Sequence, residues 1–474
     1  MSNPVNTQTD ICYVVSHGFA ARMILQTDLL GKLVKNGYKI SLISPDAKDP
    51  ILNNYCQKNQ IGLFKYQSKK WIWKSNYMLY RSYFLEDIKA NPALYEKHYH
   101  EMYHSKRMFL RWIPSLLICF YYIFKTFPIL RKCFLFFEEK LLHSKSAITL
   151  LTNLNPKILV STYPVNVQEG ILLYNAKKLK IKTLIHLLSW DNISCKGYFL
   201  SDANYYIAWG PIMKNEFIDK YKMNPDNIFI TGVPHFDLHI QTRNQNGNAE
   251  ILNIFGLDPS KPFLIFGMSS PRFVPKEIDI VEYIAERINE NQFGPEIQMI
   301  IRPHPQNVKG WMADLKWIER IKALENKRIK IFYPFIAESN LPWSMELDDM
   351  QKLSALLASC IACINSCSTL SIDTLMAGKG NIAPMFDGNV QLPYWNSAKR
   401  LLDYNHIKKF VTLGGTLVTS NFEELEHAIK QYLQDPSYMN SKRITTILSE
   451  CNSTEDNATL NVVSCLENIL KTEK

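Results

Sequence analysis

The sequence predicts an α/β protein of two domains, each built on a doubly wound parallel sheet. At 474 residues the chain exceeds the length at which one hydrophobic core keeps growing, so two domains of roughly 200 residues are expected. Short apolar runs alternate with helical patterns in both halves, which is the order of a parallel sheet with crossover helices. Hydrophobic residues make up 46% of the chain and charged residues 21%, a composition typical of folded proteins and not of disordered ones.

The N-terminal half opens with a strand, a turn, a helix and a second strand. The strands are the apolar runs 11–15 and 39–44, and Gly37 is expected to end the helix between them. The turn holds a single glycine, Gly18, so it is not the G-x-G-x-x-G dinucleotide fingerprint. The further strands expected in this half lie at 158–161, 183–188, 205–208 and 228–231.

The C-terminal half repeats this alternation after a polar segment, QTRNQNGNAE, at 241–250. Its composition is that of a linker, so we expect an N-terminal domain at 1–240 and a C-terminal domain at 251–455. A last helix with an apolar stripe, within 456–474, is expected to pack back on the first domain. The strands expected in the second half lie at 263–266, 299–302, 330–332, 361–364 and 381–384.

The first domain should carry a helical insertion, about 66–145, that is rich in basic and aromatic residues. Its longest uncharged run, 112–124, has 13 residues, fewer than the ~20 that span a bilayer, so no transmembrane helix is expected. Two interpretations stay open: the apolar segment lies on an anionic membrane surface, or it forms a buried helix pair. The flanking basic residues are Lys106, Arg107, Arg111, Lys125, Arg131 and Lys132.

The N-terminus and the cysteines indicate the compartment. The chain begins MSNPVNTQTD, without a basic stretch followed by an apolar run, so no signal peptide is expected. Ten cysteines lie mostly in apolar runs, as small hydrophobic residues do in a reducing compartment. We expect a cytoplasmic protein, peripheral on the inner face of the membrane if the insertion binds lipid, with no cofactor and no metal. Nucleic acid is disfavoured as a partner, because no known binding module is present and the basic residues coincide with an apolar stretch.

A small polar turn between the strands 361–364 and 381–384 is the first candidate site. Ser366, Ser368 and Thr369 stand where a helix begins, so hydroxyls, backbone amides and the positive end of the helix dipole can bind a phosphate. The alternative is an ordinary helix cap, because serine and threonine begin many helices that bind no ligand.

Polar motifs follow several predicted strands, and together they resemble a known superfamily. The motifs are SWDNISCKG at 189–197, TGVPHFD at 231–237, IRPHPQN at 301–307 and SCSTLSID at 366–373. With two successive doubly wound domains, they resemble GT-B-fold glycosyltransferases, and more distantly the CDP-glycerol glycerophosphotransferases and the UDP-N-acetylglucosamine 2-epimerases. This resemblance spans nearly the whole chain and implies two Rossmann-like domains with sheets that face across a cleft.

The match to these relatives is uneven along the chain. TGVPHFD is similar to the hinge motif of the glycerophosphotransferases, with His235 in place of an arginine. Their tryptophan-histidine-glycine motif corresponds to SWDNISCKG, which lacks the histidine that those enzymes use. The Gly-Gly-x-x-x-Glu donor turn of the epimerases is replaced by SCSTLSID. The resemblance therefore favours sugar transfer over polyol-phosphate transfer.

Donor chemistry requires positive charge or hydrogen-bond donors at the departing diphosphate. Asp348 and Asp349 are adjacent and form no D-x-D pair, so we expect a metal-independent site built from arginine, histidine and helix amides. Asp373 is expected to hydrogen-bond a donor hydroxyl, or else to face solvent. The complete expected donor-binding set is Ser269, Ser270, Arg272, Arg302, His304, Ser366, Ser368, Thr369 and Asp373.

An inverting transfer also requires a general base near the acceptor hydroxyl. His17 and Asp191 are the main candidates, with Glu169 next, because each follows a predicted strand at the edge where parallel sheets bind ligands. Asp191 has an alternative role as a helix cap. The expected acceptor-binding residues are Arg22, Trp190, which would stack on a sugar ring, and Asn192.

The leading hypothesis is a glycosyltransferase of surface polysaccharide or lipopolysaccharide biosynthesis. It would move a sugar from a nucleoside-diphosphate sugar to a glycan or lipid-linked acceptor. The alternatives are a CDP-polyol phosphotransferase, which would release CMP, and a non-catalytic GT-B-like subunit that binds glycan.

Overall fold

The computed structural model describes residues 8–68, 77–104, 111–187, 189–245, 250–308, 315–334, 341, 345–346 and 348–472. The chain divides into two compact units. The first comprises Met1–Val233, Glu338–Ser344 and Thr459–Lys474, and the second comprises Pro234–Ala337 and Met345–Ala458. The division falls before the expected linker 241–250, whose first residues belong to a helix and whose residues 246–249 lie outside the described ranges.

The first unit is built on a parallel sheet of seven strands, in the order β3-β2-β1-β4-β5-β6-β7. Ile11 of β1 lies in register with Ile40 on the neighbouring strand β2 and with Ile158 on the neighbouring strand β4. The strands are β1 (Ile11–Val14), β2 (Ile40–Ser44), β3 (Gly62–Lys65), β4 (Ile158–Ser161), β5 (Lys182–His186), β6 (Tyr205–Ala208) and β7 (Ile228–Ile230). Strand β3 is not predicted from the sequence, because it lies at the sheet edge and its residues are only partly buried.

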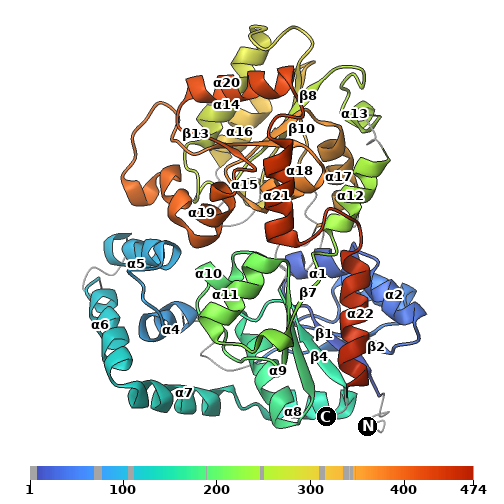
Figure 1. Ribbon diagram of the computed structural model, residues 1–474, viewed down its shortest axis with the longest axis vertical. Helices are drawn as coiled ribbons and strands as arrows, with labels where there is room; N and C mark the ends of the chain where they lie inside the picture. Colours follow the sequence, from blue (N-terminus) through green and yellow to red (C-terminus); the bar gives the residue numbers. More distant parts are fainter. Residues whose placement is uncertain are drawn as a thin grey trace. The chain divides into compact units, whose positions relative to one another are not determined.

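Helices cover both faces of this sheet, so the unit has three layers (Figure 1). One core lies under α1, α2, α3 and α22, and the other under α8 and α9. The C-terminal helix α22 contributes Val462, Leu466 and Ile469 to the first core, as expected for a helix that packs back on this unit, whereas Leu460 is exposed. The helices of this unit are α1 (Gly18–Leu25), α2 (Leu29–Lys35), α3 (Pro50–Lys58), α4 (Tyr77–Leu85), α5 (Pro92–His104), α6 (Ile113–Thr126), α7 (Pro128–Leu142), α8 (Lys145–Leu154), α9 (Val167–Lys178), α10 (Asn192–Cys195), α11 (Pro211–Tyr221), η3 (Pro225–Asn227) and α22 (Ala458–Lys471).

The second unit is built on a parallel sheet of six strands, in the order β10-β9-β8-β11-β12-β13. The strands are β8 (Phe263–Gly267), β9 (Gln298–Arg302), β10 (Ile329–Ile331), β11 (Ala362–Ile364), β12 (Gly380–Pro384) and β13 (Leu417–Thr419). Both sheets are parallel and helix-covered, which confirms the predicted α/β class of two doubly wound domains. Strand β13, like β3, is a short edge strand that the sequence does not predict.

The second sheet is also covered on both faces (Figure 1). Helices α14, α16 and α20 bury one face, and α13, α17 and α18 bury the other. The helices are α12 (Phe236–Asn244), α13 (Ile251–Ile254), α14 (Glu277–Asn289), α15 (Pro305–Val308), α16 (Leu315–Ala323), α17 (Asp349–Ser359), α18 (Thr369–Met376), η4 (Tyr394–Asn396), η5 (Ala398–Asp403), α19 (Asn405–Thr412), α20 (Phe422–Gln434) and α21 (Asn440–Cys451).

The basic and aromatic insertion forms helices. Its helices α4 and α5 contribute buried residues such as Tyr83 and Leu94, whereas α6 and α7 are largely exposed. Helices α6 and α7 meet at Phe127 with a bend of 111°, and many of their large apolar side chains are exposed. In the described residues no single helix is long and apolar enough to cross a membrane. Taken together, the two helices of this bent pair have the length and composition of a membrane span. Residues 111–142 are thus only partly buried, which differs from a fully buried helix pair, while Lys106 and Arg107 lie outside the described ranges.

Candidate active site

The strand order of the second sheet reverses between β8 and β11, so the turns that follow these two strands lie side by side. In open parallel sheets, ligands bind in the crevice at the carboxyl ends of the strands where the order reverses. Ser269 and Ser270 follow β8, and Ser366 and Ser368 follow β11. The expected donor residues from these two turns are therefore brought to one crevice.

A buried glutamate holds the two turns together. Glu277, the first residue of α14, accepts the backbone N–H of Ser269 over 2.6 Å and the hydroxyl of Ser366 over 2.7 Å. The Glu277 side chain has no exposed area, and burial raises its pKa to about 8. The Ser366 hydroxyl is thus engaged by the protein, which differs from its expected role as a phosphate ligand.

The turn into α18 is organised by Asn365. Its side-chain oxygen accepts the backbone N–H of Ser368 over 3.2 Å and the hydroxyl of Ser371 over 2.8 Å. Cys367 has φ 50, in the left-handed region, which lets the chain turn sharply between strand and helix. Ser368 caps the helix by accepting the N–H of Leu370, and Thr369 is exposed at the first helical position.

Arg302 is the last residue of β9 and lies beside this crevice, and one nitrogen of its guanidinium group makes no hydrogen bond to the described residues. Its Nη2 donates to both carboxylate oxygens of Asp349 over 2.9 Å, and its Cζ lies 4.2 Å from the ring centroid of Phe332. Only 8% of the residue is exposed, yet its Nη1 has no hydrogen-bond partner among the described residues. A buried unpaired donor is costly, so Arg302 retains donor capacity that a bound anion would satisfy.

His304 follows Arg302 and is held in one tautomer. The backbone N–H of Gln306 donates to its Nδ1 over 3.1 Å, and Asn307 accepts the His304 N–H while donating to the Ser269 carbonyl over 2.9 Å. Because Nδ1 accepts, the proton of the neutral ring lies on Nε2. Burial, and then the positive charge of Arg302, lower the pKa of His304 to about 4, so the ring is a neutral Nε2–H donor at neutral pH.

The remaining expected donor residues have other surroundings. Arg272 is exposed, and the turn that carries it is fixed by buried Arg400, which donates to the carbonyls of Arg272 and Phe273. Asp373 lies within α18, only 8% exposed, and bonds to His239 Nε2 over 2.8 Å. Asp373 is therefore not the solvent-facing acid of the alternative prediction, because its carboxylate bonds to His239 of the neighbouring helix α12.

The first sheet reverses its order between β1 and β4, and a second buried glutamate joins its two turns. Glu169 of α9 accepts the hydroxyls of Ser16 and Ser161 and the backbone N–H groups of Thr162 and Tyr163. The Glu169 side chain has no exposed area, and burial raises its pKa. With its carboxylate oxygens occupied in this way, Glu169 organises the crevice, which argues against its expected role as a reserve base.

His17 lies in this first crevice in the same tautomer as His304. The backbone N–H of Phe19 donates to its Nδ1 over 3.2 Å, so the neutral ring carries its proton on Nε2. Burial, and then Lys196, lower the pKa of His17 to about 4. Acting as a base through Nε2 would require a proton on Nδ1, which would oppose the Phe19 N–H. This geometry argues against the expected role of His17 as a base and makes it a hydrogen-bond donor.

Asp191 is the carboxylate of this crevice that remains partly open. Its side chain is 25% exposed, accepts the Ser189 hydroxyl and pairs with Lys196 over 3.2 Å. Although Asp191 precedes α10, its side chain makes no capping hydrogen bond, so the alternative role as a helix cap is not observed. The negative charge of Asp191 is the main cause of a raised pKa at Lys196, a residue that the sequence does not mark as part of the site.

Two of the three expected acceptor residues, Trp190 and Asn192, have side chains that the structure describes, and both are buried. Trp190 is 5% exposed, so its ring packs into the protein instead of lying open to stack on a sugar. Asn192 is 1% exposed, and neither atom of its amide has a hydrogen-bond partner among the described residues. Arg22 lies in α1, and its side chain is outside the described part of the chain.

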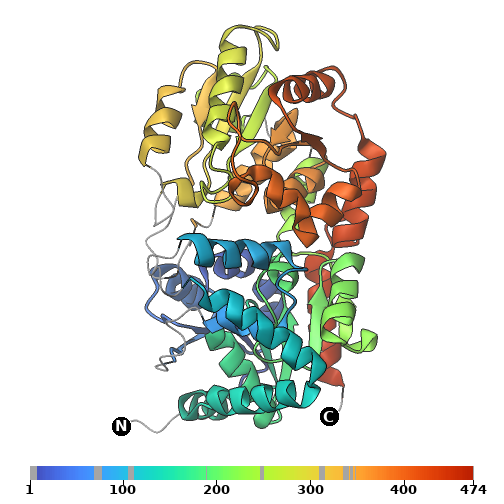
Figure 2. The same cartoon turned by 90° about the vertical axis from the view of Figure 1, so that its left-hand side faces the viewer.

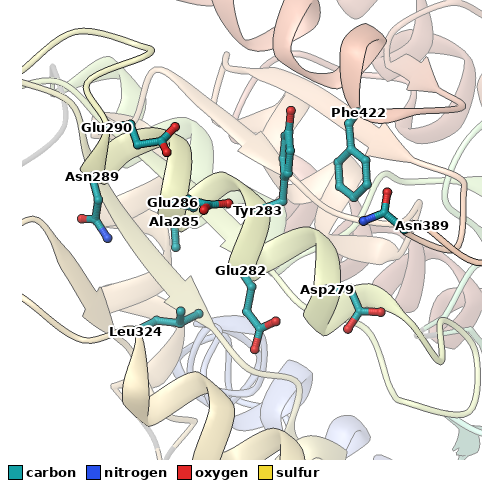
Figure 3. A pocket seen from close by; sticks show the side chains of 10 residues that line it. All are labelled: Asp279, Glu282, Tyr283, Ala285, Glu286, Asn289, Glu290, Leu324, Asn389 and Phe422. Carbon is teal, nitrogen blue, oxygen red and sulfur yellow. The ribbon is translucent and has the colours of Figure 1, made fainter.

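A separate pocket on the second unit lies along α14 and is acidic (Figure 3). Asp279, Glu282, Glu286 and Glu290 contribute carboxylates to its lining, together with the rings of Tyr283 and Phe422, whose centroids lie 4.1 Å apart. A diphosphate would be repelled there, so this pocket is not the donor site.

Sequence comparison assigns no family: no family model matches the chain, and no curated protein matches it. Solved structures match over nearly its whole length. S. aureus MnaA in complex with UDP aligns with a TM-score of 0.55 at 10% identity, covering 98% of this chain and 99% of that chain. UDP-GlcNAc 2-epimerase from Neisseria meningitidis bound to UDP-GlcNAc gives 0.52 at 10% identity, covering 97% and 100%.

The wall teichoic acid polymerase TagF, as a point variant, aligns with a TM-score of 0.50 at 10% identity, covering 99% of this chain and 91% of that chain. Together these similarities show that the chain shares its two-domain α/β fold with these structures, which confirms the fold that the predicted resemblance implies.

The buried position of Glu277 predicts a pH-dependent stability. Its folded pKa, about 8, lies above the ordinary value of 4.5, so its stabilising contribution is full below about pH 4.5 and declines as the pH rises toward 8. Glu277→Gln does not titrate, so the Tm of this variant minus that of wild type should increase from pH 5 to pH 8.5. Glu290→Gln, at an exposed glutamate after the same helix, is the control and should show no such trend. A constant difference for Glu277→Gln would contradict the assignment.

The tautomer of His17 can be observed directly by nitrogen NMR of the labelled protein. We expect Nδ1 to be unprotonated and Nε2 protonated from pH 5.5 to 8, because the pKa is lowered to about 4 and Phe19 donates to Nδ1. A His17→Gln variant identifies the resonances and retains an N–H donor. Titration of His17 near pH 6.5, or a proton on Nδ1, would restore it as a base candidate.

Proposed function

We propose that the protein is a glycosyltransferase that moves a sugar from a nucleoside-diphosphate sugar to a saccharide or lipid-linked acceptor. Its setting would be surface polysaccharide or lipopolysaccharide biosynthesis, at the inner face of the cytoplasmic membrane. The observation that carries the proposal is the unpaired Nη1 of Arg302, a buried cationic donor beside the crevice where this fold binds ligands.

The donor crevice suits a diphosphate leaving group. Arg302 supplies a charged N–H, His304 a neutral one, and the N-terminus of α18 adds backbone amides near exposed Thr369. Because these groups are fixed by Asp349, Gln306 and Asn365, they need little rearrangement when charge develops on the departing diphosphate. The matched structures of MnaA with UDP and of the Neisseria meningitidis epimerase with UDP-GlcNAc support a nucleotide-sugar ligand.

Metal independence is part of the proposal. The two adjacent carboxylates that offer the best alternative are already engaged, since Asp349 pairs with Arg302 and Asp348 pairs with Lys352 over 2.7 Å. Positive charge from Arg302 therefore takes the place that a divalent ion would have at the diphosphate. Turnover is expected to survive EDTA.

The first unit would supply the acceptor side. Asp191 acts as the general base toward the acceptor hydroxyl, with Lys196 and Ser189 fixing its carboxylate. The buried amide of Asn192 offers a donor and an acceptor for a second hydroxyl, and His17 offers its Nε2–H. A non-catalytic role does not explain this partly open carboxylate as directly.

The donor assignment predicts that Arg302→Lys weakens binding of a nucleoside diphosphate by about 10 to 1,000 fold, the loss expected for a charged hydrogen bond to phosphate. Lysine keeps a cation opposite Asp349, whereas alanine would leave that carboxylate buried and unpaired. Calorimetric titration with UDP, GDP, dTDP, ADP and CMP measures the affinity. Arg320→Lys, on α16, is the control because it changes an arginine paired with Asp279 and Glu282 outside the crevice. Equal affinities in wild type and Arg302→Lys would contradict the donor site, and selective binding of CMP would favour the polyol-phosphate alternative.

The base assignment predicts that Asp191→Asn lowers turnover by about 10² to 10⁴ fold while Tm stays near the wild-type value. Release of nucleoside diphosphate from the donor, in the presence of acceptor, is the readout. Asp202→Asn is the matched control, because Asp202 also pairs with a lysine of the first unit but is more exposed. If both variants retain wild-type turnover, the base lies elsewhere or the reaction retains configuration without one.

A further inference from the structure

Helices α6 and α7 form an elbow whose large apolar side chains are exposed, and no part of the donor or acceptor chemistry uses it. Figures 1 and 2 show the two helices as arms that meet at a corner on the first unit. The exposed apolar residues of the elbow are Trp112, Leu116, Phe120, Tyr122, Ile123, Phe127, Ile129, Leu130, Phe136, Phe137 and Leu141. Apolar residues on the surface of a soluble monomer are usually scattered singly, so a concentration of this kind marks an interaction surface.

The exposed residues follow helical spacing, so they form continuous stripes. On α6 the stripe runs through Leu116, Phe120 and Ile123 to Phe127, at steps of three or four residues. On α7 it runs through Leu130, Phe137 and Leu141. The largest exposed fractions near the corner are 56% for Phe127 and 64% for Ile129.

The opposite side of the elbow is anchored to the first unit. Phe84 of α4 contacts the rings of Phe124 and Phe134 at centroid distances of 5.8 and 5.3 Å. Buried Glu138 pairs with Arg81 over 2.6 Å. The exposed stripes therefore belong to a surface held in place by packing and by a buried ion pair.

This surface carries an excess of positive charge, which favours an anionic binding partner. Along 111–142 the basic residues are Arg111, Lys125, Arg131, Lys132 and Lys140, and the only exposed acidic residue in that described range is Glu139. Lys140 lies 4.7 Å from the ring centroid of Phe136, so cation and aromatic group share one surface. A second copy of this basic surface would repel the first, whereas aromatic side chains mixed with lysine and arginine match the interface of an anionic bilayer.

We propose that the α6–α7 elbow is a docking surface for an anionic lipid bilayer, which it enters from one side without crossing. At 1.5 Å per residue the 14 residues of α6 extend only about 21 Å, less than the ~30 Å of a hydrocarbon core. The 111° bend turns α7 away from the axis of α6, so the pair does not form one continuous span. The inference deepens the proposed function by bringing the first unit to lipid-linked acceptors, but its test does not require turnover.

Vesicle sedimentation of the full chain tests the docking surface. The charge variant Lys125→Ser/Lys132→Ser/Lys140→Ser should partition into anionic vesicles about 100 fold more weakly, from about 1 kcal/mol per basic residue. The apolar variant Ile129→Ser/Phe137→Ser, at side chains 64% and 62% exposed, should also lose binding with an unchanged Tm. Ile444→Ser/Leu448→Ser on α21 is the control, since it removes two apolar side chains, 40% and 44% exposed, from the second unit.

Two native cysteines can be labelled to measure how deeply the elbow enters the bilayer, so this experiment needs no new mutations. Cys119 and Cys133 are exposed on the elbow, whereas the other eight cysteines are buried. Environment-sensitive fluorophores on these two thiols should shift to the blue with anionic vesicles and be quenched by lipid-borne quenchers. A quencher sealed inside the vesicles should reach neither label.

Three outcomes would overturn the proposal: wild-type protein that does not bind anionic vesicles, quenching from inside the vesicles, or a vesicle-free dimer abolished by Ile129→Ser/Phe137→Ser. The second would indicate crossing, and the third would indicate a second copy as the occupant. Nucleoside-diphosphate affinity of the elbow variants should equal that of wild type, so failure of membrane docking and failure of the donor site are distinguishable.

Discussion

Each sheet brings two strand-end turns together where its strand order reverses, and a buried glutamate holds them in place. In the first unit Glu169 joins the turns after β1 and β4, and in the second Glu277 joins those after β8 and β11. Without these carboxyl groups, backbone N–H groups at both crevices would be buried without acceptors, which costs about 1–3 kcal/mol each. The placement of the neighbouring imidazole and arginine groups depends on these turns.

The same arrangement explains why two histidines in different units have equivalent chemistry. His17 and His304 each accept a backbone N–H two residues later, and burial beside a cation lowers both pKa values to about 4. A neutral imidazole that donates from Nε2 can bind an oxygen of a substrate but does not remove its proton. In the proposed mechanism, hydrogen-bond donors therefore bind the diphosphate, and the carboxylate of Asp191 removes the proton of the acceptor hydroxyl.

Much of the fold follows from the sequence, because strands buried on both faces read as continuous apolar runs. The edge strands β3 and β13 have partly exposed residues and lack that contrast. Within the site, the sequence indicates the right turns but not the use of each side chain. A serine at such a turn serves equally as a phosphate ligand, as a helix cap or as a partner for Glu277, which lies 89 residues from Ser366. Long-range partners such as Asp349 for Arg302 leave no local signal either.

The central claim is that the unpaired side of Arg302 binds the diphosphate of a nucleotide-sugar donor. A crystal structure of the wild-type protein with a nucleoside diphosphate tests it most directly. The account predicts a phosphate oxygen within hydrogen-bond distance of Arg302 Nη1, with the Arg302–Asp349 pair intact and the diphosphate between the turns after β8 and β11. A diphosphate bound elsewhere on the second unit, with Arg302 Nη1 still unpaired, would contradict it.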